Sequence, residues 1–154
     1  MTTTDERVSE ITKALAHREW VPSETEQAVG ALIVRKRQSL MGHLDQQPMT
    51  GRSKAEGLRL QQDLADQVAR ESLPAARELL GRSLMVELIE AYVDTLRAMA
   101  PYADKLRPLL EAGGESLTEY DVLTPAEREK MQDVWTAIIA AGSVLGAAVT
   151  GDVD

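Results

Sequence analysis

The strongest constraint on the fold is an uncharged stretch of 16 residues, from Val134 to Val149. As a helix it would be about 24 Å long, at about 1.5 Å per residue. A bilayer core of about 30 Å needs roughly 20 residues. The flanking residues are Asp133 and Asp152, and Trp135 is the only aromatic side chain near the stretch, so the usual membrane anchors are missing. We therefore predict a helix that is surrounded by protein, and no membrane span.

Small residues inside this stretch indicate close helix packing. Gly142 and Gly146 are four residues apart, a spacing that lets two helices approach closely. In a helix that faces water, each glycine would only cost about 1 kcal/mol relative to alanine. The stretch is therefore expected to be the central helix of a bundle, which we favour, or a seam where copies of the chain or a partner pack. In the second case Val144, Leu145 and Val149 are the candidate contact residues.

Helix start signals recur along the chain, whereas strand signals do not. In a capping box, a Ser or Thr and a Glu three residues later each satisfy a free backbone N–H of the first turn. The sequence has capping boxes at Thr3/Glu6, Ser23/Glu26 and Thr124/Glu127. It has no sustained apolar–polar alternation and no Asn-Gly or Asp-Gly hairpin turn. We predict an all-α fold.

The expected architecture is a single, compact, bundle-like domain of five to seven helices over residues 1–154, with the apolar C-terminal helix as its most buried element. The 154 residues suffice for a core without covalent staples. Helices are predicted near 4–20, 24–41, 53–71, 72–99 with a break at Gly81 and Ser83, 101–110 with an interruption at Pro108, and 125–149. Loops are predicted near 42–52 and 113–124, and flexible ends at 1–3 and 150–154.

Two details of these helices are testable against a structure. Ser72 is expected to cap a new helix whose first turn contains Pro74, where the missing N–H costs nothing. In the helix over 24–41, the apolar stripe is expected to consist of Val29, Leu32, Ile33 and Leu40.

Composition and charge narrow the class of protein. The chain has no cysteine, which excludes disulfides and thiolate metal sites. Its net charge of −8 lies entirely in residues 78–154, because residues 1–77 carry 11 acidic and 11 basic side chains. The N-terminal residues have no basic start followed by an apolar run, so we expect no secretory signal and a cytoplasmic location. The abundance of Arg and Ala suggests a bacterial or phage source.

No catalytic or metal-binding motif stands out. A nucleophile elbow and a phosphate-binding glycine loop are both absent from the sequence. Glu87, Glu90 and Asp94 share one helix face at i, i+3 and i+7, which would suit a ligand or metal only if a second carboxylate set faced them. His17 and His43 do not follow a glutamate by three residues. We therefore expect no enzyme, no metal and no cofactor, and keep a ligand-binding or enzymatic bundle that uses this acidic stripe as an alternative.

The clearest basic cluster spans two segments of the N-terminal half. It contains Arg35, Lys36, Arg37, Arg52 and Lys54. Such a patch would suit nucleic-acid phosphates, an acidic partner, or the acidic half of another copy. Cations near a helix C-terminus also simply complement the helix dipole. The protein is acidic overall, and the following loop is longer than a helix-turn-helix turn, so nucleic-acid binding is an alternative that we do not favour.

From these observations we predict a non-enzymatic helical interaction protein, a small adaptor, assembly or regulatory factor. It would act through protein–protein contacts, with a protein partner or with its own copies. The basic cluster and the residues 144, 145 and 149 are the surfaces that would make those contacts.

Overall fold

The computed structural model describes residues 3–48, 50–111 and 118–151, and it is 87% helical with no strand in these ranges. Within these ranges, seven helices have eight residues or more. One further helix, α7, has four residues. The helices are α1 (Thr4–Ala16), α2 (Glu24–Met41), α3 (Gly51–Gln67), α4 (Leu73–Leu80), α5 (Leu84–Ala98), α6 (Ala100–Glu111), α7 (Glu119–Val122) and α8 (Pro125–Thr150). The predicted all-α class with five to seven helices in a compact arrangement is confirmed.

The three predicted capping boxes are formed and start α1, α2 and α8. The side chains of Thr3, Ser23 and Thr124 each accept a hydrogen bond from the backbone N–H three residues on, and the glutamate there accepts one from the backbone N–H of the capping residue. Helix α2 covers the predicted residues. Helix α8 ends at Thr150, followed by Gly151 in the left-handed conformation.

Helix α1 ends earlier than predicted, at Ala16, in a tight left-handed turn. Arg18 has a φ of 57°, and it is the one non-glycine residue with positive φ in the described part of the chain. The N–H of Glu19 donates to the carbonyl of Ala14 at 2.8 Å, and that of Arg18 donates to Leu15 at 3.2 Å. This pair of bonds is a Schellman motif, which normally places glycine where Arg18 stands.

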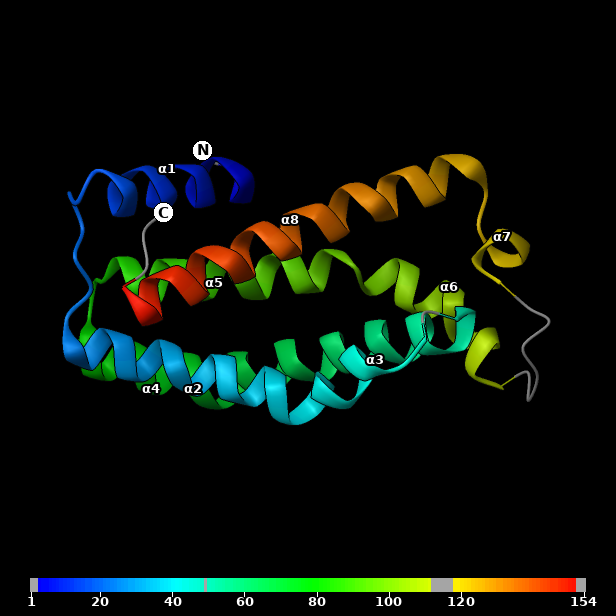
Figure 1. Ribbon diagram of the computed structural model, residues 1–154, viewed down its shortest axis with the longest axis horizontal. Helices are drawn as coiled ribbons and strands as arrows, with labels where there is room; N and C mark the ends of the chain where they lie inside the picture. Colours follow the sequence, from blue (N-terminus) through cyan, green and yellow to red (C-terminus); the bar gives the residue numbers. More distant parts are fainter. Residues whose placement is uncertain (1–2, 49, 112–117, 152–154) are drawn as a thin grey trace.

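The central helix is α5, and the expectation that α8 is the most buried element is not confirmed. Nine of the 15 residues of α5 are buried, against five of the 26 in α8. Figure 1 shows α5 running through the middle of an elongated molecule, and it contacts α1, α3, α4 and α8. Since α8 packs mainly on α2 and α5, one side of it stays open to solvent.

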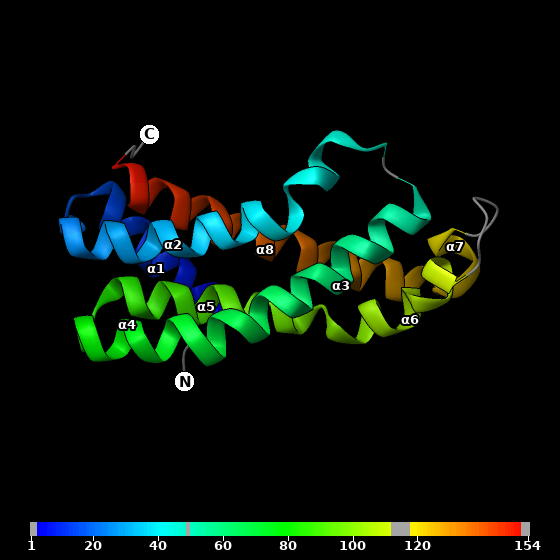
Figure 2. The same ribbon diagram turned by 90° about the horizontal axis from the view of Figure 1, so that it is seen from below.

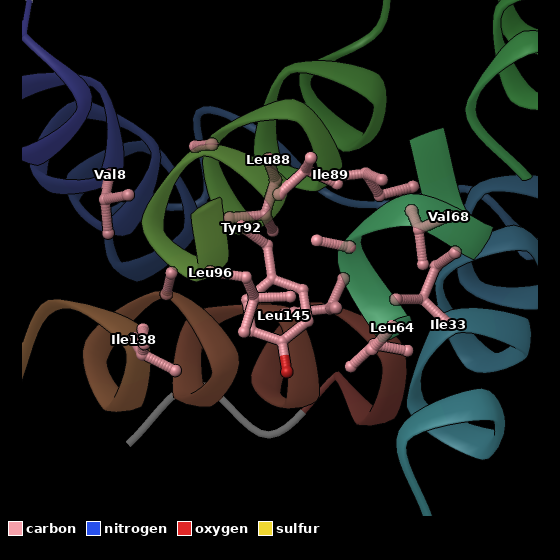
Figure 3. Packing of buried hydrophobic residues seen from close by; sticks show 14 of the residues in the cluster. Val8, Ile33, Leu64, Val68, Leu88, Ile89, Tyr92, Leu96, Ile138 and Leu145 are labelled. Carbon is pink, nitrogen blue, oxygen red and sulfur yellow. The ribbon is translucent and has the colours of Figure 1, made fainter. Parts of the chain in front are cut away.

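The core is one continuous cluster of mostly aliphatic side chains, which also contains the aromatic rings of Trp20 and Tyr92. Figure 3 shows the Tyr92 ring extending from α5 toward α8, beside Leu145. Ile33 of α2 meets Leu64 and Val68 on the adjoining side. Burial of such side chains, at roughly 25 cal/mol per Å² of apolar surface, is the main force that holds the helices together.

Helices α3 and α4 form one bent rod, which Figure 2 shows alongside α2. They are joined by a π-helical turn, Val68–Ser72, so the prediction that Ser72 caps a separate helix was wrong: its side chain makes no capping bond. Pro74 explains the turn. Its ring would clash with the carbonyl four residues earlier, that of Arg70, and it has no N–H to offer. The wider π-helical turn avoids the clash and does not need the missing N–H, so the helix continues through it.

The remaining connections follow the predictions in part. The break at Gly81–Ser83 is present, with Gly81 at a φ of 62°. The predicted loop near 42–52 contains a 3₁₀ turn, Gly42–Gln46, and Pro108 lies inside α6 without ending it. Residues 112–117 of the second predicted loop and the ends 1–2 and 152–154 lie outside the described residues.

Candidate binding groove

An apolar groove lies between α2 and α4, with a volume of about 530 Å³. The α2 residues that line it recur three or four positions apart along the helix, and so do those of α4. Two residues of the π-turn line one end of the groove. The lining residues are Val29, Leu32, Arg35, Lys36, Ser39, Glu71, Ser72, Ala75, Ala76 and Leu79. We call this the α2–α4 groove.

Two exposed leucines lie on opposite walls of the α2–α4 groove. Leu32 of α2 is 52% exposed and Leu79 of α4 is 64% exposed, and together they add exposed apolar surface to the groove. Between them the small side chains of Ala75 and Ala76 leave the hollow. The sequence analysis placed both Leu32 and Ile33 on the inward stripe of this helix; Ile33 is fully buried, whereas the placement of Leu32 was wrong.

The rim of the groove is positively charged. Lys36 reaches Glu71 of the π-turn, with 3.3 Å between Nζ and Oε2. Arg35 is exposed, and its Nε donates to the carbonyl of Ala31 at 3.4 Å, which leaves its terminal nitrogens at the groove edge. Two cations against one carboxylate give the rim a net positive charge on a chain whose total is −8.

The other three residues of the predicted basic cluster lie elsewhere. Arg37 points toward α8 and Tyr92, because two residues along a helix correspond to a rotation of about 200°. Lys54 is only 23% exposed and pairs with Glu119 of α7 at 2.8 Å. Arg52 is exposed in the first turn of α3. The predicted cluster is therefore divided: Arg35 and Lys36 border the α2–α4 groove, whereas Arg37 and Lys54 line a different cavity, between α2 and α3.

The predicted contact residues of α8 lie mostly against its own chain. Leu145 is 1% exposed, and Val149 and Val144 are partly buried against the core. A methyl group of Val149 occupies the space above Gly30 of α2. Within the described residues, this end of α8 thus serves as a packing surface for α2 and α5.

Helix α8 has the length and mean hydropathy of a membrane-crossing helix, with 28% of its most apolar window buried. Helices in the cores of water-soluble proteins can have the same length and hydropathy, so these two properties are weak evidence for a membrane span.

The acidic stripe of α5 does not converge on a site. Glu87 pairs with Arg7 of α1 at 2.8 Å, and Glu90 pairs with Arg77 of α4 at 3.1 Å. Asp94 is exposed. In the described ranges no three His, Asp or Glu side chains are grouped closely enough to hold a metal ion.

Comparison of the chain with protein-family models, with curated protein sequences and with solved structures finds no match. The α2–α4 groove was missed by sequence reasoning, because its apolar residues are those of an ordinary buried stripe. The local signal was Pro74 in the middle of a helical pattern, which indicates a backbone irregularity and so a change in the direction that α4 faces.

Proposed function

We propose that this chain is a non-enzymatic interaction protein that binds an amphipathic helix of a protein partner in the α2–α4 groove. The observation that supports this proposal is the pair of exposed leucines, Leu32 and Leu79, on opposite walls of an apolar hollow with a cationic rim. Exposed apolar surface of this kind is typical of sites for protein partners.

The dimensions of the groove suit a helix. Its α2 wall runs from Val29 to Ser39, about 15 Å at 1.5 Å per residue, which corresponds to nearly three helical turns. A partner helix in such a groove inserts apolar side chains at i, i+3 or i+4, and i+7. Because Arg35 and Lys36 border the groove, the partner helix is expected to carry Asp or Glu beside its apolar face.

Site-specific photo-crosslinking tests this proposal directly. A photoreactive residue at Ser39, inside the groove, should give a discrete adduct in cells of the source organism, and mass spectrometry should map it to an acidic amphipathic segment. The same residue at Ser9, exposed on α1, serves as the matched control. A synthetic peptide of that segment should then bind the purified chain, and Leu32→Glu with Leu79→Glu should abolish the binding.

Val21→Glu is the control for the added charge, because Val21 is 70% exposed and lies outside the groove. It should bind the peptide as the wild type does. Adducts that map to the chain itself, together with a dimer mass in light scattering, would replace the partner with a second copy. Equal adduct patterns from Ser39 and Ser9 would contradict the proposal.

A further inference from the structure

A second cavity, separate from the α2–α4 groove, lies between α2 and α8 and reaches down to α3 and α5. Its volume is about 360 Å³, and we call it the α2–α8 pocket. Its walls are mostly apolar. They include Ile33 and Val34 of α2 and Trp135, Ile138 and Ile139 of α8. Pockets for small ligands have this composition, with a few polar groups that fix the ligand's orientation.

The glycine pair of α8 helps to create the space. Gly142 and Gly146 both line the pocket. A β-carbon added at Gly146 would meet no atom within 4 Å, and one at Gly142 would lie at an ordinary 3.5 Å from the Tyr92 ring. At Gly30 of α2, in contrast, an added β-carbon would lie only 2.7 Å from Cγ2 of Val149. The two glycines therefore leave a hollow where the sequence suggested a helix seam.

One polar side chain that lines this pocket, Gln61, has an atom with no hydrogen-bond partner in the described part of the chain. Gln61 is 5% exposed, and its Oε1 accepts no hydrogen bond within the described part of the chain. Its neighbour Gln62, in contrast, donates to the carbonyl of Leu96 at 2.7 Å. Most buried polar side-chain atoms in proteins have a partner, so the Gln61 carbonyl requires an explanation. The Oε1 atom is itself buried, but Gln61 lines the pocket, and rotation of its amide toward the cavity would let a bound molecule with an O–H or N–H donor supply the missing bond.

A cation, Arg37, also lines this pocket. Tyr92 is 3% exposed, and burial raises the pKa of its phenol, an effect that the nearby Arg37 guanidinium partly offsets. Arg37 hydrogen-bonds the Tyr92 phenol, and its ion pair with Asp45, at 3.9 Å, is loose and solvent-exposed. Such pairs contribute little, so the guanidinium is available to an anion in the pocket.

We propose that the α2–α8 pocket binds a small, largely apolar carboxylic acid that also carries an O–H or N–H donor. The carboxylate pairs with Arg37 beside the Tyr92 hydroxyl, the donor bonds to Oε1 of Gln61, and the apolar body lies against Trp135 and Ile138. A water molecule occupies roughly 30 Å³ in the liquid. If each non-hydrogen atom of a ligand needs a similar volume, the pocket has room for a ligand of about a dozen such atoms.

Calorimetric titration with 4-hydroxyphenylacetate tests the proposal, since this acid has the required size, an aromatic body, a carboxylate and a hydroxyl donor. Phenylacetate lacks the donor, and 4-hydroxyphenylacetamide lacks the charge. We expect the first to bind more weakly by roughly three- to tenfold and the second by about ten- to a hundredfold. The indole N–H resonance of Trp135 should shift on binding while that of Trp20, outside the pocket, stays in place.

Single substitutions test which residue is responsible for the preference for the carboxylate and which for the preference for the hydroxyl. Arg37→Gln should remove the preference for the acid over the amide, and Arg59→Gln, which removes an exposed cation of α3, should leave it intact. Gln61→Leu should remove the preference for the hydroxyl. Gly146→Leu should fill the pocket and abolish binding of all three compounds, with the helical circular dichroism unchanged.

Two outcomes would overturn the proposal. Binding of none of the compounds at millimolar concentration would mean that the pocket holds only water. Equal affinity for acid and amide, unaltered in Arg37→Gln, would mean that the cation does not select the ligand. Neither outcome bears on the α2–α4 groove, because Gln61, Tyr92 and Gly146 do not line it.

Discussion

Val149 of α8 closes over Gly30 of α2, and this contact sets how closely the two helices approach. A β-carbon at position 30 would lie 2.7 Å from Cγ2 of Val149 and 3.1 Å from the thioether of Met85. A valine side chain has few rotamers with which to move away. The glycine is therefore required by packing, in the middle of a helix where it otherwise lowers stability.

Gly30→Ala should destabilise the fold by about 1–2 kcal/mol, because overpacking outweighs the gain of about 1 kcal/mol in helix propensity. Val149→Ala alone should also destabilise it, through lost burial. Together the two changes should cost less than the sum of their separate effects, as expected for residues in contact. Urea unfolding of the four proteins measures this; strict additivity would mean that the two residues do not touch.

Arg18→Gly should stabilise the protein by about 1 kcal/mol, since an L-residue pays about 1–2 kcal/mol in the left-handed conformation that Arg18 adopts. For a chain of this size the gain corresponds to a rise of roughly 2–4 °C in Tm. Arg18→Ala removes the same side chain but keeps the strain, so it should show no rise. A similar rise in both variants would assign the effect to the lost charge instead.

Glu26 links three segments, and its pKa makes part of the stability dependent on pH. Burial raises the pKa of Glu26, but hydrogen bonds from the Ser23 N–H, the Ser83 hydroxyl and the Trp20 indole outweigh it and hold the pKa below its ordinary value. A depressed folded-state pKa contributes stability above the unfolded pKa, about 4.3, and this stability is lost as the pH falls through the folded value.

Glu26→Gln should therefore cost about 1 kcal/mol at pH 7, less than a fully buried charge-assisted hydrogen bond because solvent screens the site. The difference from wild type should shrink as the pH falls below about 4, where the wild-type carboxylate also protonates. Thermal unfolding of both proteins between pH 7 and pH 3 checks the sign. A difference that stays constant over this range would show that the carboxylate's charge has no part in it.

A chain that ends after Ala141 should fail to fold cooperatively. It lacks Leu145, which is 1% exposed, and Ala148, which is fully buried. Removing one such leucine costs about 2–5 kcal/mol, a large part of a total stability of about 5–15 kcal/mol. Light scattering measures the mass of the full-length and shortened chains in solution, and circular dichroism measures whether each is folded. A folded monomer from the shortened chain, alongside an oligomeric full-length chain, would make this end of α8 a seam between molecules.

Local signals along the chain predicted the helices well. The Ser23/Glu26 box and the apolar run that follows placed α2 correctly, because capping depends only on neighbours in the sequence. Helix α5 is more buried than α8 because more helices surround it. The number of helices around a given helix cannot be predicted from a local sequence pattern. The same holds for Gln61, whose burial without a partner arises only when α3 meets α2 and α8.

The π-turn at Val68–Ser72 has a consequence for insertions and deletions in this chain. A turn of this kind accommodates an additional residue compared with regular α-helix. Each residue in an α-helix corresponds to a rotation of about 100°. If Pro74→Ala let the five residues of the turn become regular α-helix with no deletion, Leu79 and its neighbours would turn by about 100° and leave the groove, whereas deleting one residue as well would return them close to their present direction. The α2–α4 groove therefore depends on the length of the chain at one point as much as on the residues that line it.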